Sequence, residues 1–209
     1  MKQLLIYDRP RELNRVAHIT RQTLGFYRDT SSPVRFNVAS TLDDVLGLYE
    51  RRFETRNIRV VKQYDDDAEI VALAGEIRQA FSNLLTNALD AMPSAGTLSL
   101  RIHKSHKWDN AHAPGVRIVI ADSGSGISPE HKQNLFQPFF TTKADVGTGL
   151  GLWITRGIIE KHGGSIRARS RTGQKHGTTF SMFLPGVPKH SREQAQLGTQ
   201  PEHELVAGD

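Results

Sequence analysis

The sequence predicts a protein of the α/β (α+β) class. Two observations support this class. First, several segments of strand length have apolar residues that alternate or run together. Second, longer segments whose apolar residues recur at the period of a helix are interspersed with them. With 209 residues, the chain is long enough for one domain with a sizeable hydrophobic core and an appendage, and we do not expect two full domains.

The expected elements alternate irregularly between helix and strand. The helix at 76–92 is expected to bury one face, because an apolar stripe runs along it: Phe81, Leu84, Leu85, Ala88, Leu89 and Met92. In chain order we expect a helix at 42–55, a strand at 58–64, a helix at 76–92, strands at 97–103 and 116–121, a helix at 150–162, and strands at 165–170 and 178–184.

The two ends of the chain differ from this central region, which we place at residues 33–186. Residues 11–29 are expected to form a helix that packs against a partner helix, and Pro33 ends the segment. Residues 1–32 are therefore interpreted as a partial helical hairpin. Residues 187–209 are polar, lack a hydrophobic period and contain prolines and glycines, so we expect a disordered tail. The seam of the first helix consists of Leu13, Ala17, Thr20, Leu24 and Tyr27.

Composition excludes several kinds of protein. The chain has no cysteine, so it can form neither a disulfide framework nor a thiolate metal site. No apolar run approaches the roughly 18 residues needed to span a bilayer, so we expect a cytoplasmic protein with no membrane segment. Much of the net charge of +5 comes from arginines in the first part of the chain, without interleaved aromatic residues. This pattern favours a solvated basic helical face over nucleic-acid binding.

Two asparagines on the expected helix at 76–92 are candidate ligand-binding residues. Asn83 and Asn87 are four positions apart, so their amides project from one face of the helix, where they can hold a metal ion and phosphate oxygens. Asparagines can also simply bond neighbouring turns of a helix. Two of them within an otherwise apolar stripe favour the ligand-binding interpretation.

Two glycine-rich segments lie where strands end or helices begin. Asp122 to Gly126 reads Asp-Ser-Gly-Ser-Gly and follows the apolar strand at 116–121, which is also compatible with a plain Asp-Ser-Gly turn. Gly147 to Gly151 reads Gly-Thr-Gly-Leu-Gly and precedes the helix at 150–162. Glycines let the backbone approach a ligand closely, and the amides at a helix start attract phosphate. Together with the two asparagines, these segments predict a nucleotide site.

These motifs resemble the ATP-binding domain of sensor histidine kinases, within the superfamily of gyrase, chaperone, histidine kinase and mismatch-repair ATPases. The resemblance implies a two-layer sandwich in which a mixed sheet packs against helices, with ATP held between the N-box helix and the glycine loops. Five boxes in order across about a hundred residues rarely coincide by chance. They are the N box at 83–91, the first glycine box at 122–126, the phenylalanine box at 136–143, the second glycine box at 147–151, and the segment 177–180 just before Leu184 and Pro185.

The resemblance implies roles for residues at the phosphates. Asn87 would supply a side-chain oxygen to Mg²⁺, and Asn83 would support the metal or its waters. Lys143, in a mobile lid at 141–146, is a candidate phosphate contact. Asp90 stands where many histidine kinases hold a basic or polar phosphate contact, so here it is expected to influence the metal shell instead. The second glycine box adds Gly147, Thr148, Gly149, Leu150 and Gly151 to the cofactor-binding residues.

The resemblance also implies how the base is selected. The Asp122 carboxylate would accept a hydrogen bond from the exocyclic amine of adenine, which selects ATP over GTP because guanine has a carbonyl there. Gly124 and Gly126 would let the backbone approach the base. Thr178 resembles a threonine that shares hydrogen bonds with this aspartate through water, with the adjacent Thr179 as the alternative. Packing and signalling roles stay equally open for the aromatic residues at the base of the lid: Phe136, Phe139 and Phe140.

The histidines and Asn83 indicate which reaction to expect. Superfamily members that hydrolyse ATP generally carry a glutamate general base at the position of Asn83, and an amide cannot take a proton from water. We therefore expect phosphoryl transfer to an imidazole rather than fast hydrolysis. Residues 11–29 resemble the second helix of the dimerisation and phosphotransfer hairpin, but the first helix of that hairpin, with its His-Glu pattern, does not precede them in this sequence. His18 is followed by Ile19 instead of a carboxylate, so we interpret it as a surface residue.

Three more histidines lie in or next to a polar stretch at 104–115. His103, His106 and His112 could in principle bind a metal, but their spacing matches no tetrahedral ligand pattern. We therefore expect an exposed loop between two strands.

The function that the sequence favours is the ATP-binding catalytic domain of a two-component sensor histidine kinase. It would transfer the γ-phosphate of ATP, with Mg²⁺, to a histidine on a dimerisation helix. A response regulator is the expected protein partner, and the full-length parent is expected to be a homodimer. One alternative is a nucleotide-regulated binding module without catalysis, and another is a serine kinase or slow ATPase of the same superfamily.

Overall fold

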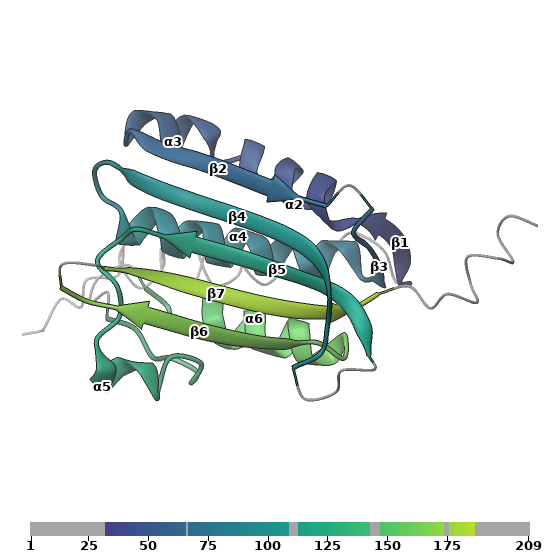
Figure 1. Cartoon of the computed structure of the whole chain (residues 1–209). Helices are drawn as coiled ribbons and strands as arrows, with labels where there is room; N and C mark the ends of the chain where they lie inside the picture. Colours follow the sequence, from purple (N-terminus) through teal and green to yellow (C-terminus); the bar gives the residue numbers. More distant parts are fainter. Residues whose placement is uncertain (1–31, 66, 109–112, 143–146, 174–175, 187–209) are drawn as a thin grey trace, which may run out of the picture.

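In the computed structural model, the chain forms a five-stranded mixed sheet, a separate two-stranded sheet, and helices packed against one face of the larger sheet (Figure 1). The expected hairpin segment and C-terminal tail lie outside the described residues, apart from Ser32. The described residues are 32–65, 67–108, 113–142, 147–173 and 176–186.

The five-stranded sheet confirms the expected α/β sandwich with a mixed sheet. Its strand order is β2-β4-β5-β7-β6, with β2 and β4 parallel and all other neighbours antiparallel. Parallel neighbours need a crossover connection, and the longest helix supplies it between β2 and β4. The strands are β2 (Ile58–Tyr64), β4 (Gly96–His106), β5 (Pro114–Asp122), β6 (Ser165–Arg171) and β7 (Gly177–Pro185).

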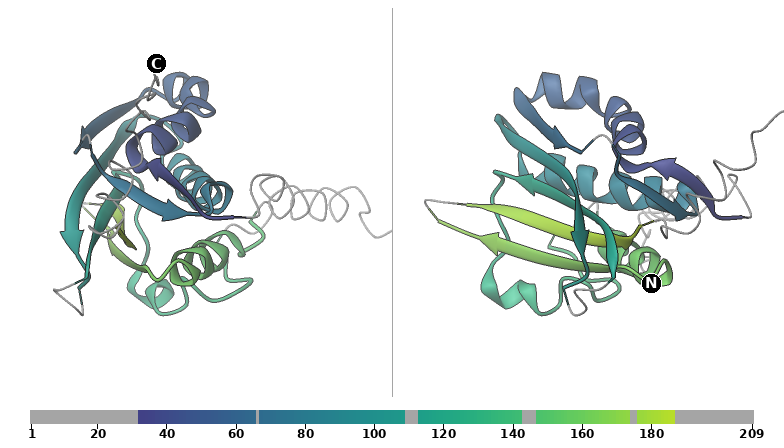
Figure 2. Two further views of the ribbon diagram at one scale, coloured as in Figure 1. Left: turned by 90° about the vertical axis from the view of Figure 1, so that its right-hand side faces the viewer. Right: turned by 45° about the vertical axis from the view of Figure 1, so that its right-hand side comes forward.

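The described helices cover one face of this sheet, and none of them lies on the other face (Figure 2). Even-numbered strand residues such as Leu100, Ile118 and Met182 point toward the helices and form the core. No helix among the described ranges is both long and apolar enough to cross a bilayer. The helices are α2 (Val38–Gly47), α3 (Glu50–Thr55), α4 (Ala74–Ala91), α5 (Pro129–Lys132) and α6 (Gly151–Lys161).

The single helix expected at 42–55 is in fact two helices, and that expectation was wrong in two respects. α2 begins earlier, because the Asn37 side chain caps it by accepting hydrogen bonds from the amides of Ala39 (2.8 Å) and Ser40 (3.1 Å). It ends at Gly47, a poor helix former. After the break, the Tyr49 hydroxyl lies 2.6 Å from Ser82 Oγ on α4, which ties this corner to the longest helix.

Three short elements were not predicted from the sequence. β1 (Val34–Asn37) and β3 (Glu69–Ala72) pair in an antiparallel sheet of their own. Each has four residues, too few for alternation to be distinguished from chance. The short helix α5 has no buried residue and therefore no apolar period.

The loop expected at 104–115 is shorter than the sequence suggested. β4 continues to His106 and β5 begins at Pro114, so polar residues at the end of the hairpin are still paired in the sheet. His103 lies within β4, and His112 lies outside the described residues. In the described part of the chain, no group of three or more His, Asp or Glu residues could hold a metal ion.

Replacing the cap of α2 tests this account of the fold. The Asn37→Ala variant should lose about 1 kcal/mol of unfolding free energy, because two amides at the helix start lose their acceptor. Urea unfolding followed by circular dichroism measures this loss. The Asn37→Ser variant keeps an acceptor and should stay within about 0.5 kcal/mol of the unsubstituted chain. Equal losses in both variants would show that the cap is not what starts α2.

Candidate functional site

The long helix α4 positions the polar residues that the sequence singled out. Its apolar stripe is buried, with Phe81, Leu85 and Leu89 fully inaccessible, which fixes the rotation of the helix about its axis. Asn83 and Asn87, four residues apart, consequently project together from a different side of α4 than the apolar stripe. Asp90 follows in the last turn and is exposed.

Asn83 links α4 to the first turn of α6. Its side chain is buried, and its Nδ2 donates to the carbonyl oxygen of Gly151 (3.1 Å) and to the hydroxyl of Thr155 (3.3 Å). The Thr155 hydroxyl in turn donates to the same Gly151 carbonyl at 2.8 Å. Because the nitrogen is engaged in this network, only the amide oxygen of Asn83 remains for a metal or its waters.

Asn87 is placed differently from Asn83. It is half-buried one turn further along α4, and its amide has no hydrogen-bond partner among the residues that the structure describes. A side chain that contributes nothing to internal bonding at a helix face is available to a ligand. The two asparagines therefore differ in their roles, although the sequence motif treats them alike.

The second glycine box packs against both α4 and the phenylalanine box. Gly151 contacts the Asn83 side chain, and the buried Thr148 hydroxyl accepts from the Leu150 amide at 3.4 Å. Gly149 has a φ of +68° and lies so close to Phe139 that a Cβ would collide with the Phe139 backbone. Gly147 is half-buried at the start of the loop, and Lys143 lies outside the described residues.

Asp122 lies at the end of β5, where its carboxylate is held by two backbone amides. Oδ1 accepts from Gly124 at 2.9 Å and from Thr178 at 3.2 Å. Oδ2 has no hydrogen-bond partner within the described ranges. Burial raises the pKa of the Asp122 carboxyl, and the two backbone hydrogen bonds offset part of this rise. Oδ1 of Asp122 thus forms hydrogen bonds within the fold, and Oδ2 remains available to a ligand.

The first glycine box is fastened to the C-terminal end of α4. The amide of Ser125 donates to the carbonyl oxygen of Ala91 at 3.1 Å, and Gly124 packs directly against Ala91. Gly126 has a φ of +76°, and a Cβ there would collide with the carbonyl of Arg171 on β6. These glycines are therefore required for packing against α4 and β6.

Strand register decides between the two adjacent threonines. Thr178 pairs with Asp122 across β5 and β7, so both side chains point toward the helices, whereas Thr179 points to the opposite face. Thr178 is buried, and its hydroxyl lies 3.0 Å from Ser170 Oγ. Ser170 also accepts from the Ile127 amide at 2.7 Å, which connects β6 to the first glycine box.

Both glycine boxes therefore meet α4, one near Asn83 and the other at Ala91. Eight residues of α-helix separate these two contacts, a distance of about 12 Å. An elongated ligand lying along α4 would meet the Asp122 carboxylate at one end, the amide of Asn87 midway and the amide of Asn83 at the other end. This arrangement suits a nucleotide, with its base near Asp122 and its phosphates near the second glycine box.

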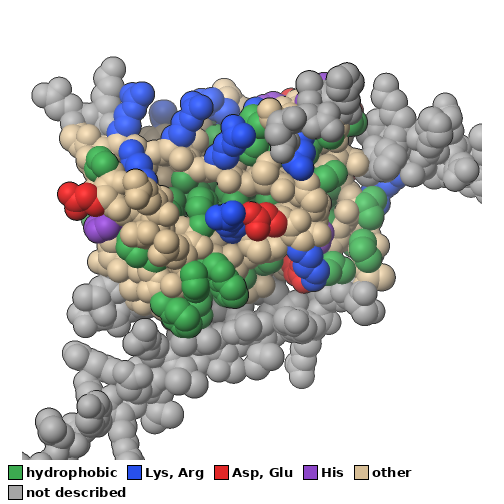
Figure 3. Space-filling view, turned by 90° about the horizontal axis from the view of Figure 1, so that it is seen from below, with side chains coloured by type: hydrophobic (Ala, Val, Ile, Leu, Met, Phe, Trp, Pro, Cys, Tyr) green, Lys and Arg blue, Asp and Glu red, His purple; other side chains and the backbone are tan. Residues whose placement is uncertain are grey.

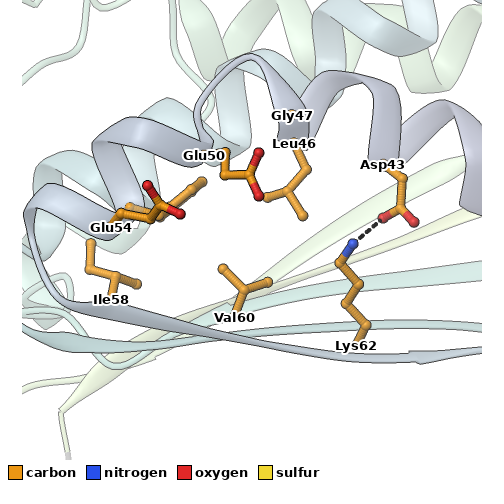
Figure 4. A pocket seen from close by; sticks show the side chains of 9 residues that line it. Asp43, Leu46, Gly47, Glu50, Glu54, Ile58, Val60 and Lys62 are labelled. Carbon is orange, nitrogen blue, oxygen red and sulfur yellow. Dashed lines mark ion pairs between the residues drawn. The ribbon is translucent and has the colours of Figure 1, made fainter.

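A cavity of about 570 Å³ opens beside Asp122 at the edge of the sheet. Its lining includes four basic or titratable side chains, which suit an anionic ligand: Lys132, Arg169, Arg171 and His176. A second cavity of about 360 Å³ lies between α2, α3 and β2, where Lys62 pairs with Asp43 at 2.9 Å (Figure 4). None of the predicted site residues lines this second cavity, so it plays no part in the nucleotide site.

The model of the family described as "Histidine kinase-, DNA gyrase B-, and HSP90-like ATPase" matches residues 73–188, which is more than half of the chain. The chain belongs to this ATPase family. The matched segment begins just before α4 and includes both glycine boxes and the Asp122–Thr178 contact. The ATPase fold therefore coincides with the part of the structure that brings the predicted site residues together.

Individual relatives of this ATPase domain are sensor kinases. The chain is 36% identical over 190 residues to sensor kinase CckA of Brucella abortus (strain 2308), which covers 86% of this chain but 20% of the relative. It is similar to the catalytic domain of histidine kinase ThkA, with a TM-score of 0.64, 30% identity, and coverage of 75% of this chain and 97% of that domain. A structure of ThkA in complex with response regulator protein TrrA matches 90% of this chain and 54% of that one, with a TM-score of 0.65 and 26% identity. The ATPase chain thus spans about a fifth of the length of the CckA relative.

Some residues of the site were not found from the sequence. Thr155 and Ser170 are buried polar residues that fix the two glycine boxes, and Lys132 and His176 line the cavity beside Asp122. Ser170 could have been found only from the pairing of β6 with β7, which places it opposite Thr178. His176 lies in a loop, and its Nδ1 donates to the Gly124 carbonyl oxygen at 2.7 Å. This contact joins distant segments and has no local sequence signal.

Substituting the two asparagines separately should distinguish their roles. Asn83→Ala should lower the unfolding free energy by about 1 to 3 kcal/mol, because Gly151 and Thr155 lose a buried hydrogen-bond partner. Asn87→Ala should change it by no more than about 0.5 kcal/mol, because that amide has no such partner. Urea unfolding of both variants without nucleotide provides the measurement. A loss in Asn87→Ala as large as that in Asn83→Ala would contradict the division of roles.

The raised pKa of Asp122 predicts a pH dependence of stability. A carboxyl whose pKa is higher in the folded than in the unfolded state destabilises the fold when ionised, and this penalty disappears as pH falls through the folded pKa. Asp122→Asn keeps an oxygen that can accept from Gly124 and Thr178, so it should fold and should lack this dependence. The unfolding free energy of the unsubstituted chain, relative to Asp122→Asn, should therefore rise as pH falls. Parallel pH profiles of the two proteins would refute this expectation.

Proposed function

We propose that this chain is the ATP-binding catalytic domain of a two-component sensor histidine kinase, which transfers the γ-phosphate of ATP to a histidine on a dimerisation helix. The observation that carries the proposal is the buried amide of Asn83, tied to Gly151 and Thr155 where superfamily ATPases that hydrolyse ATP carry a glutamate. An amide at this position cannot activate water as a general base. The similarity to sensor kinase CckA and histidine kinase ThkA supports the same choice of branch.

In this proposal, Asp122 recognises the adenine. The free Oδ2 accepts the exocyclic amine, while Oδ1 stays on the amides of Gly124 and Thr178. Guanine has a carbonyl oxygen at the same position. This oxygen would face the carboxylate oxygen of Asp122, and neither atom carries a hydrogen with which to form a hydrogen bond. Such a buried mismatch excludes GTP more strongly than a lost contact at an exposed site would. Thr178 and the glycines at 124 and 126 complete this end of the site.

The triphosphate lies at the other end, between α4 and the second glycine box. Asn87 and the amide oxygen of Asn83 form a hard oxygen donor set that fits Mg²⁺, which keeps several waters and binds phosphate oxygens as well. Bound there, Mg²⁺ would neutralise charge on the phosphates. The backbone amides of 147–151 and the start of α6 would face the same oxygens. Lys143 would approach them from the lid, and Asp90 would influence the metal shell.

The reaction needs positioning rather than covalent chemistry by this domain. An imidazole nitrogen of the acceptor histidine attacks the γ-phosphorus in line with the bond to the leaving oxygen of ADP, so the phosphoryl group moves from oxygen to nitrogen. Asn83 and Asn87 hold the phosphates in place without offering a base that would direct water to the same phosphorus. The acceptor histidine would be supplied by another chain or by a longer parent protein, because His18 in the expected hairpin helix is not followed by a carboxylate.

The same proposal extends to partners and organisation. ThkA has been observed in complex with response regulator protein TrrA, and we infer that a response regulator receives the phosphate from this system as well. We further propose residues 1–32 as part of the dimerisation hairpin, 33–186 as the catalytic domain, 187–209 as a tail, and a cytoplasmic homodimer as the working assembly.

A phosphotransfer assay tests this function. The chain is mixed with Mg²⁺, ATP labelled at the γ-phosphate, and a separately purified hairpin from a sensor histidine kinase that carries the acceptor histidine. We expect label on the hairpin that is lost in acid and survives in alkali, as phosphohistidine requires. Asn87→Ala and omission of Mg²⁺ should both reduce this labelling by at least about tenfold, because phosphate charge is left without neutralisation.

Other outcomes would favour the alternatives. Acid-stable label on either protein would favour a serine kinase, and release of inorganic phosphate without any labelled protein would favour a slow ATPase. Saturable nucleotide binding with no ATP consumed would favour a nucleotide-regulated binding module.

A further inference from the structure

One face of the sheet is covered by none of the helices that the structure describes, and its strands carry a one-sided set of charges. Odd-numbered strand residues point to this face, because their even-numbered neighbours form the core under the helices. None of these odd-numbered positions in the five strands holds an aspartate or glutamate. Six arginines occupy them instead: Arg59, Arg101, Arg117, Arg167, Arg169 and Arg171. Seen from the side of β6 and α6, Lys and Arg side chains gather along the upper margin of the molecule (Figure 3).

These arginines have no counter-ions in the described part of the chain. Each ion pair there joins other residues, such as Lys62 with Asp43 and Arg156 with Glu160. Arg117 and Arg167 even share one aromatic ring, with their guanidinium carbons 4.6 and 4.4 Å from the centroid of Trp108. Burial, and secondly the charge of Arg167, lower the pKa of Arg117. Like charges are thus held together without neutralisation, and an anionic partner would relieve their repulsion.

The register of the strands gives this face a shape. Arg101 and Arg167 lie in one row across the sheet, separated by Val119 and Ser181. Three strand spacings put the two arginine positions about 14 Å apart. In the neighbouring row, the positions on β4, β5 and β7 are Ser99, Ala121 and Thr179, which all have small side chains. Arg117 and the Trp108 ring packed against it lie at one end of this strip, next to Val119 on β5. We call the strip between Arg101 and Arg167 the trough; its width is close to that of one α-helix of about 10 to 12 Å diameter.

We propose that this trough docks an acidic segment of another protein, of about the width of one helix. Arginine suits this partner, because its planar guanidinium binds carboxylates through two parallel hydrogen bonds. Carboxylates along both sides of an acidic helix would meet Arg101 on one side and Arg167 on the other.

The face does not suit the two other anionic partners. Membrane-surface binding uses exposed apolar side chains, and the large hydrophobic residues exposed in the structure, such as Phe139 and Trp153, are not in these strands. Single-stranded nucleic acid needs aromatic platforms for its bases. Phe183 in β7 is fully buried, and the ring of Trp108, next to the strands, is already packed against the guanidinium groups of Arg117 and Arg167.

Binding of a labelled peptide tests the proposal. The probe is a fluorescein-labelled helical peptide of about 20 residues rich in Glu and Ala, with a Gln and Ala peptide as its neutral counterpart. The full chain, the double variant Arg101→Gln/Arg167→Gln and the control Arg35→Gln/Arg51→Gln are titrated by fluorescence anisotropy. Both variants remove two positive charges, and the control arginines are exposed on β1 and α3, away from the trough. Circular dichroism checks that both variants are folded.

We expect the acidic peptide to bind and the neutral peptide not to bind. Affinity should fall about fivefold in Arg101→Gln/Arg167→Gln, remain unchanged in the control, and decrease with added salt. Equal losses in the two variants would overturn the proposal, because they would show attraction to net charge alone. It would also be overturned if an oligothymidylate or phosphatidylserine vesicles bound more tightly than the peptide with the same dependence on Arg101 and Arg167.

Discussion

Burial of one face of α4 against the sheet is the constraint on which the rest of the structure depends. The inaccessible side chains of Phe81, Leu85 and Leu89 fix both the height and the rotation of this helix. With the rotation fixed, Asn83 contacts α6 and the second glycine box, and the carbonyl of Ala91 meets the first glycine box. A shift of α4 by one residue would turn its side chains by about 100° and separate all of these contacts at once. The site is therefore a consequence of how the core packs.

Asn83 and Asp122 each use one polar atom for hydrogen bonds within the fold and leave another for the ligand. The nitrogen of Asn83 binds Gly151 and Thr155, which leaves its oxygen. One oxygen of Asp122 binds two backbone amides, which leaves the other. This division holds the ligand-binding atoms in place before any ligand arrives, so that less conformational entropy is lost on binding. It also explains why substitutions in such a site alter stability and binding together, unless the substituted residue, like Asn87, has no hydrogen-bond partner among the described residues.

The sequence predicted the fold class, all five strands of the main sheet, the helices at α4 and α6, and the family, because these depend on local periodicity and on motifs with fixed spacing. It did not predict the break between α2 and α3, which follows Gly47 and is accompanied by a contact between Tyr49 and Ser82, residues that lie far apart in the chain. Nor did it reveal Ser170, Thr155 or the arginine trough, because these arise from strand register and helix packing between residues far apart in the chain. Lys143 lies outside the described residues, so its phosphate contact stays a prediction.

The most direct test of the central claim is a calorimetric titration of the chain with non-hydrolysable analogues of ATP and GTP in the presence of Mg²⁺, repeated with Asp122→Asn. The account predicts saturable binding of the adenine analogue alone, weakened roughly 10- to 100-fold in Asp122→Asn, because an amide nitrogen would then face the adenine amine in place of Oδ2. Equal binding of both analogues, or unchanged affinity in a folded Asp122→Asn variant, would contradict it.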